Sequence, residues 1–326
     1  MMNRIKNILI AGWDFLDSYL YDIWRYWHYS QAFARFRSRK TARAYFLMSV
    51  HALEKGLALQ ERKTGFGKAK CRELLVEMAH FQQLFGADPV CQYTIEVIGR
   101  VIEFHATTGD TDAELVAQFQ SLKNETTQSE ISFDAQGGGR QIYKRDITAS
   151  LPPNAFQFFA TRYSVRQFAD GKIPEESICE AVRIAQRSPS VCNRQSCRLH
   201  YSADPKVIAK ALLHQNGAGG FGENAAAVFV VTSELAAFNR AGERNQAYVD
   251  GGIFAQTFAL GMHALGFCTC FLNWSKTARQ DRKFRRVLNI PDSEVIITLL
   301  VGGCLREEFV VAASPRIPID EVMHRL

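Results

Sequence analysis

The chain has 326 residues, of which 47% are hydrophobic and 22% are charged. These values are typical of a globular protein with room for two domains, and they exclude wholesale disorder. The net charge of +6 permits an anionic ligand, but the basic residues form no long tract of the kind that binds nucleic acid. We therefore expect no nucleic acid among the partners.

None of the eight cysteines is spaced as C-x-x-C, so the sequence predicts neither a zinc site nor a redox-active cysteine pair. We expect reduced thiols and no metal. No secretory signal is visible near the start, and no uncharged apolar run reaches the roughly 18–20 residues that span a bilayer. The expected location is cytoplasmic.

Residues 5–30 are rich in aromatic side chains and have the apolar periodicity of a helix. The predicted apolar stripe consists of Trp13, Leu16, Leu20, Ile23, Trp24 and Trp27. Such a stripe packs against another domain or subunit, or lies on a membrane surface, where Trp and Tyr favour the interface. Three aspartates on the polar side, which an anionic leaflet repels, favour protein contact. A protein peripheral to the membrane is the alternative.

The helical pattern continues from Thr41 to about Gly109. Between residues 121 and 152 the apolar periodicity is lost, and stretches of Gly, Ser, Thr, Asn and Gln around 124–129 and 136–139 predict a flexible connection. We therefore predict a helical domain over residues 1–120, a linker over 121–152 and a second domain over 153–326.

The second domain alternates helix and strand. Helices are expected at 174–188, 205–214, 245–265 and 277–288, and strands at 197–202, 225–232, 268–274 and 294–301. The helix at 245–265 is apolar on nearly every side, which predicts burial all round, and its glycines at 251, 252 and 261 allow close approach by another helix. Several helices followed by irregular alternation predict an α+β fold built in layers.

An anion-binding segment opens this domain, Arg162-Tyr163-Ser164-Val-Arg166-Gln-Phe168. Two arginines with a serine between them put fixed positive charge and a hydroxyl on one short stretch. Arginine offers a planar fork of donors that suits a phosphate, and each charge-assisted hydrogen bond contributes about 1.5–3 kcal/mol. The segment therefore predicts a bound anion.

Four motifs in order resemble the nitroreductase family of FMN-dependent oxidoreductases over about residues 155–326. They are the segment at 162–168, Ser188-Pro-Ser-Val-Cys-Asn-Arg-Gln195, Asp250-Gly-Gly-Ile-Phe-Ala-Gln256 with the following Ala264-Leu-Gly266, and Pro315-Arg-Ile-Pro-Ile-Asp-Glu-Val322. The resemblance implies a three-layer α/β/α sandwich, here preceded by an all-α N-terminal domain. It also implies a homodimer with FMN at the subunit interface, which would account for the apolar helix at 245–265.

The resemblance implies roles for single residues. Arg162, Ser164 and Arg316 would bind the FMN phosphate. Arg166 would lie at the pyrimidine edge of the flavin, where a positive charge favours the negative charge that gathers during reduction. Asn193 would hydrogen-bond the ring or the ribityl chain.

The backbone of Phe271, Leu272 and Asn273 would face flavin N5, so the expected catalytic residues are Arg166, Leu272 and Asn273. The expected cofactor-binding residues are Arg162, Tyr163, Ser164, Arg166, Ser190, Asn193, Gln195, Phe271, Leu272 and Arg316. Ser196 and Cys197 stand where the family has Pro-Trp, which predicts a different wall beside the flavin.

The implied activity is hydride transfer from NADH or NADPH, through the flavin, to a small organic acceptor such as a nitro compound, a quinone, an enone or a biosynthetic intermediate. The alternative is a flavin-binding scaffold or regulatory protein with a vestigial site that acts through its helical domain. NAD(P)H consumption in the presence of an acceptor distinguishes the two.

Overall fold

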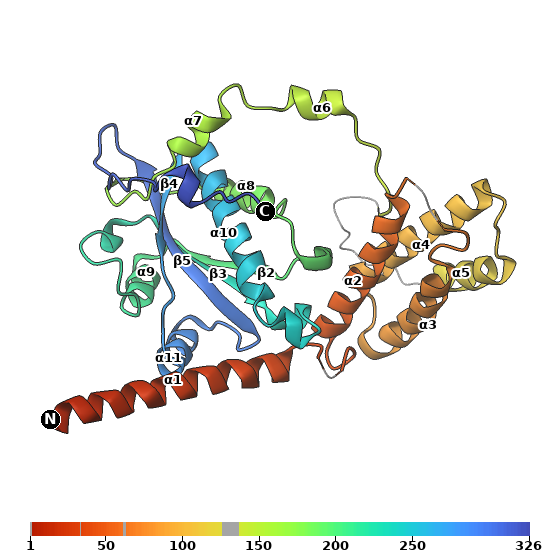
Figure 1. Ribbon diagram of the computed structural model, residues 1–326, viewed down its shortest axis with the longest axis horizontal. Coiled ribbons are helices and arrows are strands. Elements are labelled where there is room, and N and C mark those ends of the chain that lie inside the picture. The colour runs from red at the N-terminus through yellow and green to blue at the C-terminus, as the bar shows by residue number, and fades with distance from the viewer. Residues whose placement is uncertain (1, 33, 61–62, 126–136) are drawn as a thin grey trace.

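The computed structural model describes residues 2–32, 34–60, 63–125 and 137–326. A long first helix, a bundle of helices and a sheet covered by helices can be followed in Figure 1. The helix predicted over residues 5–30 is confirmed, because α1 runs over Met2–Tyr29.

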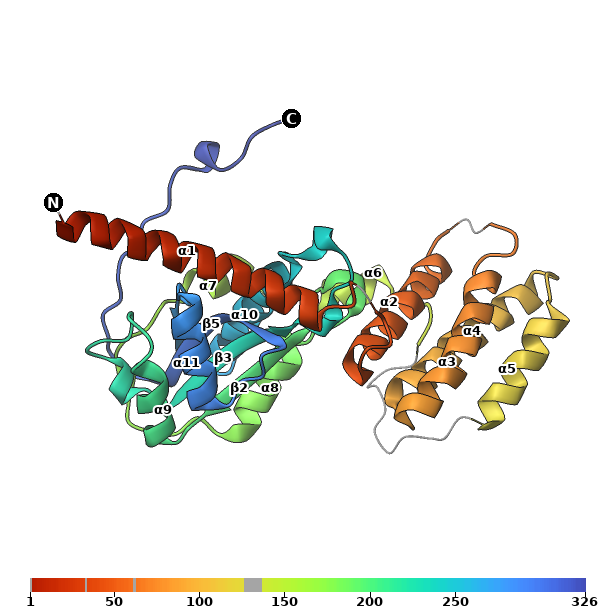
Figure 2. The same cartoon turned by 90° about the horizontal axis from the view of Figure 1, so that it is seen from below.

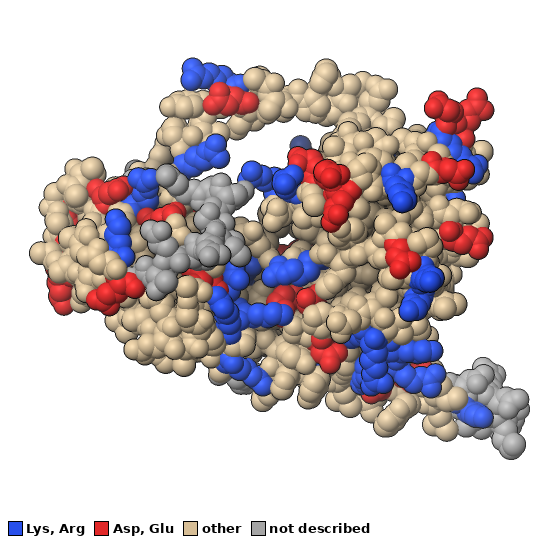
Figure 3. Space-filling view, turned by 180° about the vertical axis from the view of Figure 1, so that it is seen from behind, with Lys and Arg blue, Asp and Glu red and all other residues tan. Residues whose placement is uncertain are grey.

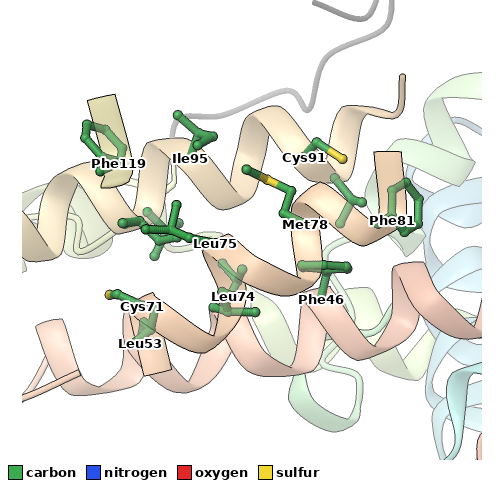
Figure 4. Packing of buried hydrophobic residues seen from close by; sticks show 14 of the residues in the cluster. Phe46, Leu53, Cys71, Leu74, Leu75, Met78, Phe81, Cys91, Ile95 and Phe119 are labelled. Carbon is green, nitrogen blue, oxygen red and sulfur yellow. The ribbon is translucent and has the colours of Figure 1, made fainter. Parts of the chain in front are cut away.

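Four helices form the bundle: α2 (Arg39–Leu57), α3 (Lys68–Phe85), α4 (Pro89–Thr107) and α5 (Ala113–Glu125). Ser38 caps α2 through a capping box, and Asp88 caps α4 directly before a proline. The facing sides bury Phe46, Leu74, Met78 and Phe81 completely (Figure 4). Each such side chain contributes about 1.5–3 kcal/mol through burial, so the bundle has a core of its own.

The connection to the second domain contains the short helices α6 (Lys144–Ala149) and α7 (Ala155–Ala160). Residues 126–136, which include half of the predicted flexible stretches at 124–129 and 136–139, lie outside the described residues. Every residue of α6 is exposed, and in Figure 1 the connection passes from the bundle to the far side of the sheet.

The sheet has the strand order β1-β5-β3-β2, with β4 also paired to β5, and every ladder is antiparallel. The strands are β1 (Phe168–Ala169), β2 (Cys197–Ser202), β3 (Ala227–Glu234), β4 (Phe267–Leu272) and β5 (Glu294–Leu305). The four predicted strands are confirmed with small shifts at their ends. The two-residue β1 was not predicted, because so short a strand carries no periodic signal.

Helices cover both faces of this sheet, so the predicted three-layer sandwich is confirmed. α8 (Glu175–Ala185) and α10 (Gln246–Ala264) pack on one face, and α9 (Pro205–Leu212) and α11 (Ala278–Leu288) on the other. Successive residues of β3 point to alternate faces, so Phe229 meets the first pair of helices and Val230 the second.

Two glycines bring α10 close to its neighbours. A Cβ on Gly261 would stand 3.2 Å from the Ala181 backbone of α8, as predicted for a helix contact, whereas one on Gly251 would meet Ile297 of β5 at 2.5 Å. The prediction that α10 is buried on all sides is wrong within one chain. Tyr248, Val249 and Ile253 are 47%, 51% and 38% exposed, because this part of α10 faces away from the core it forms with α8 and the sheet.

The first helix packs on the sheet domain rather than on the bundle, against α11 and the 3-10 helix η3 (Leu235–Ala237), and Figure 2 shows it lying across α11. The Tyr21 hydroxyl donates to Asp281 at 3.1 Å, and the Arg25 guanidinium donates to the carbonyl oxygens of Asp292 and Glu294 at 2.9 and 2.5 Å. The polar side of α1 is therefore the buried side. Within the described residues no helix has the length and apolar character needed to cross a bilayer.

Candidate functional site

The anion-binding segment is fixed to the edge of the sheet. Ser164 forms an isolated parallel bridge with Thr269 of β4, and the Val165 amide donates to the Thr269 carbonyl oxygen at 3.2 Å. Val165 is buried. Because side chains alternate along an extended segment, Arg162, Ser164 and Arg166 share the side opposite Val165.

These three residues line a cavity of about 670 Å³ together with Tyr163 and Arg316. Its wall is completed by Phe156 and Phe159 of α7 and by the chain from Ala312 to Pro315. No acidic side chain lines this cavity, and in the described parts of the chain none of its three arginines forms an ion pair. We call Arg162, Ser164, Arg166 and Arg316 the arginine half-site.

Aromatic and sulfur groups surround Arg166. Its guanidinium carbon lies 5.7 Å from the ring centroid of Phe221, and its Nη1 donates to the Ser164 carbonyl oxygen at 3.4 Å. Burial raises the pKa of the Cys270 thiol, against the opposing effect of the nearby Arg166 and Arg162 charges. Phe221 was missed in the sequence, where an aromatic residue inside a glycine-rich run was the available signal.

Two side chains hold the end of β4 by donating hydrogen bonds to its main-chain carbonyl groups. The Thr298 hydroxyl donates to the Leu272 carbonyl oxygen at 3.0 Å, and the Gln215 amide donates to that of Asn273. Leu272 is 2% exposed, and the Phe271 side chain packs with the α8 and α10 core. Any role of residues 271–273 at a flavin therefore falls to their backbone, as the resemblance implies. Leu272 lies three residues along β4 from Thr269, or about 10 Å.

Ser190, Asn193 and Gln195 lie in a loop around the short 3-10 helix η1 (Val191–Asn193). Three non-glycine residues of this loop have left-handed backbones: Cys192 (φ 48°), Asn193 (φ 51°) and Gln195 (φ 49°). Such conformations cost of order 1–3 kcal/mol each and cluster at functional sites. We call Ser190, Asn193 and Gln195 the loop half-site.

A buried arginine holds this strained loop. The Arg194 side chain is 0% exposed and donates to both carboxylate oxygens of Glu243, at 2.7 and 3.0 Å, and to the Val191 carbonyl oxygen at 3.1 Å. Burial by itself raises the pKa of Glu243, but hydrogen bonds from Arg194 and from the Asn239 amide outweigh it, and the net pKa is lowered. Glu243 is thus a carboxylate paired with Arg194.

Asp250 of the third motif supports the same loop. It is buried at the start of α10, and its Oδ2 accepts a hydrogen bond of 3.1 Å from the Val191 amide. The Gln246 side-chain amide donates a hydrogen bond of 2.8 Å to Oδ1, the other carboxylate oxygen of Asp250. This acidic residue therefore positions the loop, which explains why the second and third motifs occur together.

The two half-sites lie at opposite corners of the sheet. Gln195 is two residues before Cys197, whose partner in β3 is Ser233. On the other side, Ser164 pairs with Thr269 of β4, Thr269 pairs with Gly302 of β5, and Gly302 pairs with Ala227 of β3. Four strand spacings of about 4.8 Å and six residues of about 3.3 Å separate the two groups, so they are on the order of 25 Å apart. Figure 1 agrees, with the loop after α8 beside α2 and the segment after α7 at the other edge.

The bundle forms one wall of the cavity at the loop half-site. This cavity of about 250 Å³ is lined by Ser190 and Gln195 on one side and by Lys40, Arg43 and Leu47 of α2 on the other. The Lys40 ammonium bonds the Glu234 carboxylate at 2.5 Å, which ties α2 to the end of β3. The helical bundle therefore covers the loop half-site.

Comparison with known proteins shows a family match for part of the chain. Residues 159–303 match the model described as the nitroreductase family, a range that contains the motifs at 162–168, 188–195 and 250–266 and confirms the resemblance there. The fourth motif, at 315–322, lies beyond the matched range. No curated protein matches the sequence.

Solved structures resemble the second domain. An FMN-dependent nitroreductase from Clostridium difficile R20291 is 18% identical, with a TM-score of 0.45, and the match covers 52% of this chain and 98% of that one. A nitroreductase family protein from Streptococcus pneumoniae TIGR4 is 16% identical, with a TM-score of 0.43 and the same coverage of 52% and 98%. A nitroreductase family protein from Clostridium novyi NT is 17% identical, with a TM-score of 0.42 and coverage of 46% and 85%.

Proposed function

We propose that this chain, whose residues 159–303 form a nitroreductase-family domain, is an FMN-dependent oxidoreductase that uses NADH or NADPH to reduce a small organic acceptor. The observation that carries the proposal is the arginine half-site, a cavity of about 670 Å³ with three arginines and no acidic lining residue. When bound, FMN supplies the hydride-transfer chemistry, and the protein supplies orientation and electrostatics.

The arginine half-site fits the phosphate of FMN. Arg162, Ser164 and Arg316 line one cavity. A phosphate there can accept hydrogen bonds from two guanidinium groups and from the serine hydroxyl. Tyr163 carries a phenol and no charge, so the positive charge offered to the phosphate comes from the two arginines.

Arg166 is assigned to the pyrimidine edge of the flavin. It lies two residues beyond Ser164 on the same side of the segment, and Phe221 restrains its guanidinium. A fixed positive charge at that edge stabilises negative charge as it develops, without reorganisation at the moment of reaction. The Asn273 main chain, held by Gln215, is assigned to the edge of the ring that takes up hydride.

The complete site is proposed to need two chains. The half-sites are on the order of 25 Å apart in one chain, too far to contact the same flavin ring system. Tyr248, Val249 and Ile253 leave an apolar face of α10 exposed, and Ile317 and Val322 of the tail are 62% and 64% exposed. A homodimer that covers these surfaces would bring the loop half-site of one chain to the arginine half-site of its partner.

The acceptor is proposed to enter beside α2. Arg43 and Leu47 line the cavity at the loop half-site, so the bundle limits the size and polarity of what reaches the flavin.

The eight cysteines are free thiols, which supports a reducing, cytoplasmic compartment.

Steady-state oxidation of NADH and NADPH with a quinone and with a nitroaromatic acceptor tests the proposal. With dioxygen excluded, an enzyme consumes more than one equivalent of nicotinamide per flavin only when acceptor and FMN are both present. A flavin-binding scaffold binds FMN yet leaves the nicotinamide unchanged with either acceptor, and that result would contradict the proposal.

A further inference from the structure

The first helix presents its polar side to the protein and its apolar side to solvent. Asp17 pairs with Arg282 of α11 at 3.3 Å, and the Ser18 hydroxyl accepts from the Ala278 amide at 3.1 Å. Together with the contacts of Tyr21 and Arg25 described above, these bonds fix how α1 is rotated about its axis. Since α1 is bonded to the sheet domain over several turns, its outward face is set by the fold.

That outward face is a continuous apolar surface. Its exposed fractions are 68% for Leu9, 69% for Trp13, 50% for Leu16, 55% for Leu20 and 61% for Ile23. At about 100° per residue these positions lie opposite the row formed by Asp14, Ser18, Tyr21 and Arg25. Exposed apolar surfaces of this extent mark interaction sites in soluble proteins. We call Leu9, Trp13, Leu16, Leu20 and Ile23 the outward stripe.

The sequence suggested that the aspartates of α1 would be repelled by an anionic membrane, but the structure turns them away from the outward stripe. Asp14 and Asp17 are half-buried on the side that faces the protein, and Asp22 is the exposed acidic residue among those described between positions 8 and 27. On the helix Asp22 lies about 40° from Ser18 and about 140° from the middle of the outward stripe, so it stands beside the buried row. The aspartates therefore do not argue against contact between the outward stripe and an anionic membrane.

Basic side chains lie on α11, the helix that packs against α1. Arg279, Lys283 and Arg286 of α11 are exposed, and Figure 3 shows a cluster of basic side chains over this helix, directly beside α1. Arg286 lines one groove of about 510 Å³ with Leu20 and Trp24. Asp17 and Asp292, which also line this groove, balance the charges of Arg282 and Arg286 there, so the excess positive charge lies on Arg279 and Lys283.

We propose that α1 is an interfacial helix by which the protein binds the surface of an anionic membrane. The outward stripe would lie among the acyl chains just below the headgroups, and Arg279, Lys283 and Arg286 would contact lipid phosphates. Trp and Tyr are favoured at this boundary, and basic residues beside an apolar helix face add attraction to anionic lipids. This combination favours a lipid surface over a second copy of the chain. The proposal does not depend on the flavin chemistry.

Co-sedimentation of the full-length protein with vesicles tests it. We expect binding to vesicles of phosphatidylcholine mixed with phosphatidylglycerol, weaker binding to phosphatidylcholine alone, and a decrease as salt is added. Leu16→Glu combined with Leu20→Glu should lower the vesicle affinity by at least about tenfold. Lys283→Glu combined with Arg286→Glu should lower it by about tenfold on anionic vesicles.

Val76→Glu is the matched control, since Val76 is an apolar residue of α3 that is 70% exposed. It should bind vesicles like the unchanged protein. FMN content and circular dichroism should be the same for all variants, so a loss of lipid binding is separable from a loss of fold or flavin.

Two results would overturn the proposal. One is that the unchanged protein does not bind anionic vesicles. If light scattering then gives a lower mass for the outward-stripe variants than for the unchanged protein, a second copy of the chain covers α1. The other is equal vesicle binding by all variants, which would place the lipid contact elsewhere.

Discussion

The amide of Val165 donates a 3.2 Å hydrogen bond to the carbonyl oxygen of Thr269. This bond fastens the segment that carries Arg162 and Arg166 to β4, the strand that ends at Leu272. Arg162 and Ser164, assigned to the phosphate, and the main chain assigned to the hydride-accepting edge of the flavin are therefore held by the same strand, β4. Preorganisation of this kind keeps a cofactor oriented without further ordering when it binds.

Replacing both Arg162 and Arg316 by alanine should weaken FMN binding by about 10²- to 10⁴-fold, because two charge-assisted hydrogen bonds are lost. Quenching of FMN fluorescence measures the affinity. Riboflavin, which lacks the phosphate, should bind the variant and the unchanged protein equally. Arg145→Ala, at a side chain that is 81% exposed on α6, is the control. Full FMN occupancy in the double variant would remove these residues from the phosphate site.

Arg166→Ala should lower the reduction potential of bound FMN by about 30–60 mV, the two-electron equivalent of one charge-assisted hydrogen bond. A spectroelectrochemical titration measures it. Arg166→Lys keeps the charge and should recover part of the difference. A potential that does not move in the alanine variant rules out the proposed role.

Mixing two inactive variants tests whether the site is shared between chains. Arg162→Ala with Arg316→Ala damages one half-site, and Asn193→Ala with Gln195→Ala damages the other. In a random mixture of refolded dimers, half are mixed, and each mixed dimer has one intact site, so about a quarter of all sites should bind FMN. If each chain forms its own site, the mixture binds no more FMN than the two variants do separately.

Arg25→Met should lower the free energy of unfolding by about 2–4 kcal/mol, because the carbonyl oxygens of Asp292 and Glu294 lose their buried donor. Urea unfolding at constant protein concentration measures the change. Arg183→Met, at an ion pair whose arginine is 69% exposed, should change stability by less than about 0.5 kcal/mol. Equal effects would show that α1 is not anchored through Arg25.

The pairing of Glu243 with Arg194 predicts a pH dependence. Because the pKa of Glu243 is lower in the folded than in the unfolded state, its contribution to stability is present above the unfolded value of about 4.3 and is lost as pH falls through the folded pKa. The stability difference between the unchanged protein and Glu243→Gln should therefore be constant near pH 7 and shrink below about pH 4. Urea unfolding from pH 3 to 7 tests this, and a difference independent of pH would contradict it.

Local patterns in the sequence predicted most of the second domain. β2 was predicted with its observed bounds, Cys197–Ser202, and α11 starts directly after Thr277, where its capping box lies. Periodicity and caps are properties of neighbouring residues, so a sequence reports them directly. That Arg162, Ser164 and Arg166 face one cavity follows from the same local reasoning, since they lie within five positions of the chain, whereas Arg316 entered through the family resemblance.

Long-range relations were beyond the reach of these patterns. The apolar stripe of α1 was correctly identified, but periodicity does not say which side faces the protein, and the polar side is buried through Tyr21 and Arg25. The contact of Phe221 with Arg166 and the support of the loop by Glu243 join residues 55 and 49 positions apart. Such pairs become visible once the sheet order is known.

The most direct test of the central claim is an absorbance spectrum of the purified protein reconstituted with FMN, followed by anaerobic addition of NADH and, separately, of NADPH. We predict a yellow protein that retains its flavin through gel filtration and is bleached by at least one of the two nicotinamides. A protein that binds no FMN, or that holds FMN oxidised in the presence of both donors, would contradict an FMN-dependent oxidoreductase.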